Sequence, residues 1–381
     1  MKDNYILTAE SVTAGHPDKL CDTIADSILD ACLKEDPNAR VACEVLATAG
    51  KILVAGELRT TASPDVEAIV RQTVQNAGYD CNYHVEVRLH TQSPDIAGAV
   101  DGETLGAGDQ GILYGYACWE TVELLPAPVV LANRITSLLT TCREEKLISG
   151  IGPDGKAQVS VQYAFGVPER VDTIVISCQH DADKDPTELR EELRRLVIAR
   201  ACHDVRIDEQ TKILINPSGR FVLGGFEADT GLTGRKLMVD TYGGLAPHGG
   251  GALSGKDGTK VDRSGAYMAR YVAKNIVAAG LADVCTVSLA YAIGQAEPVA
   301  VEIDTQESGY YDDAFLTEAV RRVFDFTPAG MIRALDLDKP FFAEVCNNCH
   351  FMHPQAAWEQ TDKAEKLRMA CAELEDERAQ N

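Results

Sequence analysis

Residues 40–58, RVACEVLATAGKILVAGEL, decide the fold of this chain. They contain two apolar runs, over 40–47 and 51–58, with Gly50 between them. Apolar runs of this length separated by a glycine-containing turn are typical of a β-hairpin, so we predict two strands that turn near Gly50. Residues 17–34 precede the hairpin and repeat apolar side chains every fourth position, which predicts a helix.

The unit built around this hairpin returns twice along the chain. Its first copy continues with a helix over 64–77 and a strand over 84–90. The later copies are expected as helix 127–145, strands 157–165 and 172–180, helix 186–202 and strand 212–216, and then as helix 265–280, strands 284–293 and 298–305 and helix 312–326. Because the copies share no visible sequence, the repeat is one of architecture. It predicts an α+β fold of three similar domains, each a mostly antiparallel sheet with helices on one face.

The length of 381 residues exceeds what one hydrophobic core normally supports. We expect the divisions to follow the polar, glycine-rich stretches between the units. They are an N-terminal domain over 3–95, an active-site loop over 96–108, a central domain over 109–224, a C-terminal domain over 225–365 and a tail over 366–381.

Acidic residues dominate the composition. The 58 Asp and Glu outnumber the 36 Lys and Arg, which gives a formal net charge of −22. A field of this sign repels phosphate backbones and anionic membranes, so we expect neither a nucleic-acid nor a membrane partner. Residues 1–13 lack a basic start followed by an apolar run, and the 12 cysteines are scattered along the chain. We therefore expect a cytoplasmic protein with reduced thiols.

A short cluster of cysteine and histidine lies near the C-terminus. Cys346, Cys349 and His350 have the spacing of a c-type haem attachment site, and together with His353 they are residue types that bind zinc. Haem attachment requires export, for which residues 1–13 give no signal. A lone short cluster favours a turn without a metal, with zinc as the alternative.

Basic residues gather in one glycine-rich window, residues 219–265. It holds 13 of the chain's 31 glycines and six basic residues against five acids. The basic residues are Arg220, Arg235, Lys236, Lys256, Lys260 and Arg263. Residues 250–256 match G-x-x-x-x-G-K, but Asp257 replaces the Ser or Thr of a P-loop, and a turn follows instead of a helix. We reject a P-loop and expect this backbone to approach phosphates closely, with a flexible surface loop as the alternative.

Residues 15–19, Gly-His-Pro-Asp-Lys, open the first predicted helix. The free N–H groups and the dipole attract anions to such a terminus. His16 could donate to a phosphate oxygen and Asp18 could ligate Mg²⁺, although helix capping also explains both residues.

Three further acids stand in unexpected places. Glu44 and Glu57 interrupt the two apolar strands of the hairpin, and Asp109 is bracketed by glycines. Each alone is more typical of an exposed strand face or of a turn. Their combination with the basic window favours a functional site.

These motifs together resemble those of the methionine adenosyltransferase family. The motifs are residues 15–19, Gly-Ala-Gly-Asp-Gln-Gly at 106–111, Asp-Thr-Gly-Leu-Thr-Gly-Arg-Lys at 229–236, Asp-Thr-Tyr-Gly-Gly at 240–244, and residues 249–257. The likeness covers roughly residues 3–365. It implies that the sulfur of L-methionine attacks C5′ of ATP to form S-adenosyl-L-methionine. It also implies that the expelled tripolyphosphate is then hydrolysed with water to phosphate and diphosphate.

The resemblance also assigns roles to individual residues. The triphosphate contacts it implies are His16, Lys156, Arg235, Lys236 and Lys256. The methionine pocket is implied at Glu57, Gln92, Asp229 and Lys260, and the surroundings of the adenosine at Asp154, Arg220, Phe221, Asp229 and Ala252. Asp18 and Asp262 match Mg²⁺ ligands, and Glu44 matches a K⁺ site. Asp109 matches a carboxylate near the developing sulfonium, so the catalytic set is His16, Asp109, Lys156 and Lys256.

The family implies two Mg²⁺ and one K⁺ for each site, and a homodimer that is often paired into a tetramer. Two positions depart from its pattern. Leu253 stands where the family has Phe, which affects local packing. Cys-His-Phe-Met at 349–352 replaces Gly-His-Phe-Gly, which affects a subunit contact or the edge of the domain.

The residue types suit this reaction. A thioether needs no deprotonation, so catalysis rests on positioning and on electrostatics. Cations and Mg²⁺ neutralise the leaving triphosphate, and a carboxylate stabilises the sulfonium. A kinase or an ATP-dependent ligase shares the basic loop but releases ADP or AMP, and a non-catalytic subunit is expected to lack several of these residues.

Overall fold

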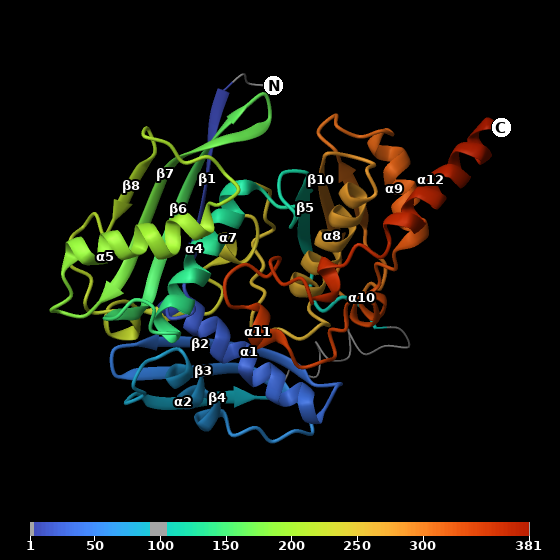
Figure 1. Ribbon diagram of the computed structural model, residues 1–381. Helices are drawn as coiled ribbons and strands as arrows, with labels where there is room; N and C mark the ends of the chain where they lie inside the picture. The colour runs from blue at the N-terminus through green and yellow to red at the C-terminus, as the bar shows by residue number, and fades with distance from the viewer. Residues whose placement is uncertain (1–3, 92–104, 381) are drawn as a thin grey trace.

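A computed structural model describes residues 4–91 and 105–380 of the chain. Within this part, three β-sheets and the helices that cover them form three α+β units (Figure 1). No helix of the described residues is long and apolar enough to cross a membrane.

The N-terminal sheet is built on the predicted hairpin. Its strands β2 (Arg40–Thr48) and β3 (Lys51–Arg59) pair antiparallel, and Gly50 turns between them with φ +73°. Strand β4 (His84–His90) joins β3 in parallel. Helix α1 (Pro17–Glu35) packs on β2 and on α2 (Val66–Asn76).

The central sheet repeats this order. Strands β6 (Ile151–Ala164) and β7 (Val167–His180) form the hairpin, and β8 (Lys212–Ile215) joins β7 in parallel. Helix α4 (Ala127–Glu144) packs on β6. The helix predicted over 186–202 is divided into α5 (Pro186–Leu193), a π-helical segment η1 (Arg194–Ile198) and α6 (Ala199–Ala201).

The C-terminal sheet contains β10 (Val284–Tyr291) and β11 (Ala300–Asp304), covered by α8 (Val261–Ala278) and α9 (Asp313–Val323). Further helices follow or connect these units. They are α7 (Leu237–Asp240), α10 (Pro328–Leu335), α11 (Phe342–Val345) and α12 (Ala364–Ala379), with 3-10 turns η2 (Gly225–Glu227) and η3 (Ala357–Glu359).

Each hairpin is extended at its first strand by a strand from another part of the chain. Strand β9 (Gly231–Leu232) pairs with β2, β1 (Asn4–Val12) pairs with β6, and β5 (Gly111–Cys118) pairs with β10, all antiparallel. None of these three strands was predicted from the sequence. The three-domain α+β architecture is confirmed, and the exact domain boundaries remain predictions because strands of one segment complete the sheet of another.

The N-terminal and C-terminal units share one hydrophobic core, whereas the central sheet and α4 have a separate one. On α1, Leu20, Ile24 and Ile28 are fully buried in the shared core. Burial of each such side chain contributes about 1.5–3 kcal/mol. The shared core therefore fixes α1 relative to the glycine-rich segment that leads into α8.

Candidate active site

The N-terminus of α1 presents His16 as a neutral hydrogen-bond donor. His16 is the N-cap, and its Nδ1 accepts a hydrogen bond from the amide of Asp18 at 3.2 Å. Burial, followed by the charges of Lys156 and Lys236, lowers the pKa of His16 to about 3. Since Nδ1 is an acceptor and the ring is neutral, Nε2 carries the proton.

Asp18 connects this helix end to the glycine-rich segment. Its carboxylate contacts Lys236 Nζ at 2.6 Å and Arg235 Nε at 3.5 Å, and it accepts the Leu232 amide at 3.0 Å. Burial opposes ionisation, but the hydrogen bonds from Lys236 and Leu232 outweigh it and lower the pKa of Asp18. Asp18 is therefore a carboxylate among cations.

The central sheet contributes Lys156 and Asp154 to the same region. Lys156 lies on β6 opposite Val12 and is exposed. Asp154 is buried, accepts the Gly225 amide at 3.0 Å, and has a pKa raised by burial to about 6. We name one group the α1 cluster, and its members are His16, Asp18, Lys156, Arg235 and Lys236.

A second group, the α8 cluster, consists of Lys256 and Asp262. Lys256 Nζ lies 2.6 Å from Asp262 Oδ2, in the first turn of α8. A Cβ at Gly251 would lie 2.3 Å from Asp262 Oδ1, so glycine permits this close approach. Gly111 also lies beside Asp262, and Asp109 precedes Gly111 by two residues. Asp109 is exposed, and its carboxylate accepts the amide of Gln110 at 2.7 Å.

The face of the N-terminal sheet that is turned away from α1 carries Glu44, Glu57 and Lys256. Ala42 on β2 is opposite Glu57 on β3 and forms an isolated bridge with Lys256. Directly paired residues point to the same face of a sheet, and Glu44 follows Ala42 by two positions. Glu44 is exposed, and Glu57 lies 3.2 Å from His90.

The two clusters lie beside different turns of α1. Asp18 belongs to the α1 cluster, whereas Asp26 accepts the amide of Gly255, next to Lys256, at 2.8 Å. Eight residues of α-helix between these aspartates span about 12 Å.

The remaining predicted site residues belong to neither cluster. Lys260 Nζ pairs with Asp257 at 2.5 Å, and Asp229 is exposed and accepts the Thr230 amide. Ala252 packs against Gly234, where an added Cβ would lie 2.6 Å from it. Gln92 lies outside the described residues.

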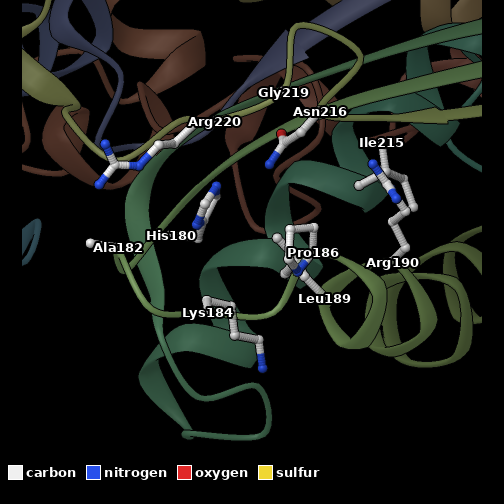
Figure 2. A pocket seen from close by; sticks show the side chains of 10 residues that line it. All are labelled: His180, Ala182, Lys184, Pro186, Leu189, Arg190, Ile215, Asn216, Gly219 and Arg220. Carbon is white, nitrogen blue, oxygen red and sulfur yellow. The ribbon is translucent and has the colours of Figure 1, made fainter.

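A pocket of about 300 Å³ lies beside the predicted adenosine surroundings (Figure 2). Arg220 lines it together with His180, Lys184 and Arg190. The amide of Phe221 donates to His180 Nε2 at 3.2 Å, so the pocket adjoins this segment. Lys184 is paired with Glu192 at 2.7 Å, which neutralises its charge.

The cysteine and histidine cluster is part of the shared core. Cys349 Sγ donates to the Thr241 carbonyl at 3.0 Å, and His350 Nδ1 lies 2.7 Å from the Tyr267 hydroxyl. Among the described residues, no three His, Cys, Asp or Glu side chains are arranged to hold a metal ion.

Comparison with known protein families accounts for nearly the whole chain. Residues 4–102 match the S-adenosylmethionine synthetase N-terminal domain, residues 104–221 match its central domain, and residues 223–360 match its C-terminal domain. The chain belongs to the S-adenosylmethionine synthetase family. Enzymes of this family are methionine adenosyltransferases, so the chain is a transferase. The resemblance inferred from the sequence motifs is confirmed.

In this synthetase, sequence reasoning missed the residues that hold the glycine-rich segment in place. Asp22 accepts the Gly234 amide at 2.9 Å, and Asp26 binds both the Gly255 amide and Arg263. Their four-residue spacing after Asp18 was a readable signal, because it aligns the three carboxylates on one helix face.

Proposed function

We propose that this synthetase transfers the adenosyl group of ATP to the sulfur of L-methionine and then hydrolyses the tripolyphosphate. The observation that carries the proposal is the pair of cationic clusters, each with one carboxylate. The α1 cluster offers Lys156, Arg235 and Lys236 beside Asp18, and the α8 cluster offers Lys256 beside Asp262.

The chemistry of these residues matches a polyanionic leaving group. The sulfur lone pair attacks C5′ directly, the C5′–O bond breaks, and the electron pair leaves with the triphosphate. Lysine and arginine side chains stabilise the charge on the departing oxygens, and His16 donates its Nε2 proton to them in a hydrogen bond. Asp109, two residues before the Gly111 that lies beside Asp262, would supply the negative charge for the sulfonium.

The carboxylates fit the metals that the family implies. Mg²⁺ is usually held by one or two carboxylates together with substrate phosphates, and Asp18 and Asp262 each offer one carboxylate beside phosphate-binding cations. Glu44, exposed on the outer face of the N-terminal sheet, offers an oxygen ligand for K⁺. When bound, two Mg²⁺ and one K⁺ neutralise part of the substrate charge.

We further propose that each site combines the α1 cluster of one subunit with the α8 cluster of a second subunit. Asp18, in the α1 cluster, and Asp26, which holds Gly255 next to Lys256, are about 12 Å apart along α1, as estimated from the rise of the helix. The face that bears Glu44 and Lys256 also exposes Leu46, with 41% of its surface accessible. A twofold homodimer, paired into a tetramer, would cover this face.

An end-product assay tests the reaction. The purified protein is incubated with ATP, L-methionine, Mg²⁺ and K⁺, and the products are identified by mass. We expect S-adenosylmethionine, phosphate and diphosphate. Release of ADP or AMP without a sulfonium product would favour a kinase or ligase, and persistence of added tripolyphosphate during synthesis would exclude the hydrolytic step.

A further inference from the structure

Helix α1 carries four aspartates at intervals of four residues. Asp18, Asp22, Asp26 and Asp30 lie on one face of the helix, because a four-residue step nearly completes a turn. Like charges at this spacing normally destabilise a helix. The first three of these aspartates are almost fully buried, which increases the cost. Their partners must therefore compensate for the repulsion.

Each aspartate accepts main-chain amides from a distant segment. Asp22 accepts the Gly234 amide at 2.9 Å and Asp26 accepts the Gly255 amide at 2.8 Å. Asp18 accepts the Leu232 amide at 3.0 Å, and Asp30 accepts the amides of 342 and 343 at 2.9 Å each. We call this row the aspartate ladder. It fastens three segments of the C-terminal unit to one helix of the N-terminal unit.

Two aspartates of the ladder bind glycine amides that lie next to the proposed phosphate-binding side chains in the sequence. Gly234 directly precedes Arg235 and Lys236, and Gly255 directly precedes Lys256. Both glycines have φ +79°. At Gly255 an added Cβ would lie 1.9 Å from the Cys43 carbonyl oxygen. Arg235 and Lys256 each directly follow a glycine whose main-chain amide donates a hydrogen bond to a buried aspartate.

Asp22 is the member best suited to orient the α1 cluster. One oxygen holds Gly234, and the other lies 3.4 Å from Lys19 Nζ. Lys19 in turn pairs with Asp240 at 2.5 Å, at the end of α7. The turn that carries Arg235 and Lys236 is thus held near its start by Asp22 and at its end by Lys19.

We propose that Asp22 is a positioning residue for adenosyl transfer: by holding the Gly234 amide it directs Arg235 and Lys236 toward the triphosphate. The inference rests on the proposed role of these two cations. Asp22 does not contact the substrate itself, because it is fully buried. Misplacement of a binding group by about 1 Å can reduce a rate by roughly 100-fold.

The test compares Asp22→Ala with Asp22→Asn and with Asp30→Ala. Asp22→Ala removes the acceptor, and we expect kcat/KM for ATP to fall by about 10- to 100-fold while KM for methionine changes less than twofold. Asp22→Asn keeps an acceptor oxygen and is expected to restore most of the rate. Burial raises the pKa of Asp22 to about 7, which is consistent with tolerance of a neutral side chain. Asp30→Ala loses contacts on the same helix, away from the phosphates, and is expected to leave kcat/KM within about threefold.

Hydrogen–deuterium exchange over residues 231–236 gives a readout that does not depend on activity. We expect the Gly234 amide to exchange slowly in the unmodified protein and in Asp22→Asn, and rapidly in Asp22→Ala. Rapid exchange in the unmodified protein overturns the proposal even if Asp22→Ala does not fold. Equal losses of kcat/KM in Asp22→Ala and Asp30→Ala also overturn it, because they indicate general destabilisation. Failure of the unmodified protein to form S-adenosylmethionine refutes the proposed function instead. In that case the exchange of the Gly234 amide still tests whether Asp22 holds this amide.

Discussion

His16 shows how one main-chain contact defines the chemistry of a side chain. The amide of Asp18 occupies Nδ1, and burial together with Lys156 and Lys236 lowers the pKa of His16 to about 3. An unfolded chain would protonate this histidine near 6.5, so the folded protein loses stability as the pH falls below that value.

We therefore expect His16 to remain neutral between pH 5 and 8 in the protein without substrates. Nitrogen-15 NMR of histidine-labelled protein measures this directly, and loss of a signal in His16→Gln assigns it. The signal is expected to show the tautomer protonated at Nε2 and no midpoint near 6.5. A midpoint near 6.5 would show that neither burial nor the charges of Lys156 and Lys236 act on the ring in solution.

Asp109 is expected to act through its charge. Asp109→Asn preserves the size of the side chain and its acceptor for the Gln110 amide but removes the negative charge that we propose stabilises the sulfonium. We expect kcat to fall by about two to three orders of magnitude, with small changes in substrate affinity. Steady-state kinetics with both substrates checks this, and a near-normal kcat would assign Asp109 to the turn alone.

At the scale of the element, the β2–β3 hairpin contains two glycines with different requirements. Gly50 has φ +73° and open space around its Cβ position. Gly56 has φ +136°, and a Cβ there would lie 2.0 Å from the Ala42 carbonyl oxygen. Both positions disfavour a side chain, but only Gly56 adds a steric clash with the neighbouring strand.

We expect Gly50→Ala to destabilise the protein by about 1 kcal/mol, the cost of left-handed backbone. Gly56→Ala is expected to cost about 3 kcal/mol or more, because the strand pair must also separate. Urea unfolding of the two variants under identical conditions measures the difference. Equal losses would mean that the hairpin relaxes around Gly56 without strain.

At the scale of the whole molecule, the separation of the two clusters predicts complementation between subunits. Variants at His16 and at Lys256 are each expected to be inactive. In mixed dimers, one site would contain both substitutions and the other neither, so random mixing is expected to restore about a quarter of the activity. Co-refolding followed by assay of S-adenosylmethionine checks this. No recovery despite demonstrated subunit exchange would place both residues of a site on one chain.

The sequence by itself determined the local features and the family. The apolar runs around Gly50, the helix over 17–34 and the order of the repeated units were readable, because hydrophobic periodicity reports local structure. The motifs at 15–19 and 249–257 also indicated the chemistry, because they place cations and carboxylates among glycines.

Only the tertiary structure decided which distant segments meet. Strand β1 completes the central sheet and β5 the C-terminal sheet, and neither pairing leaves a trace in the local pattern. The spacing of Asp22 after Asp18 was readable, but its partner was hidden, because the partner is the main-chain amide of Gly234, more than 200 residues away. Every residue except proline has such an amide, so its partner is selected by packing of the shared core and not by the identity of a side chain.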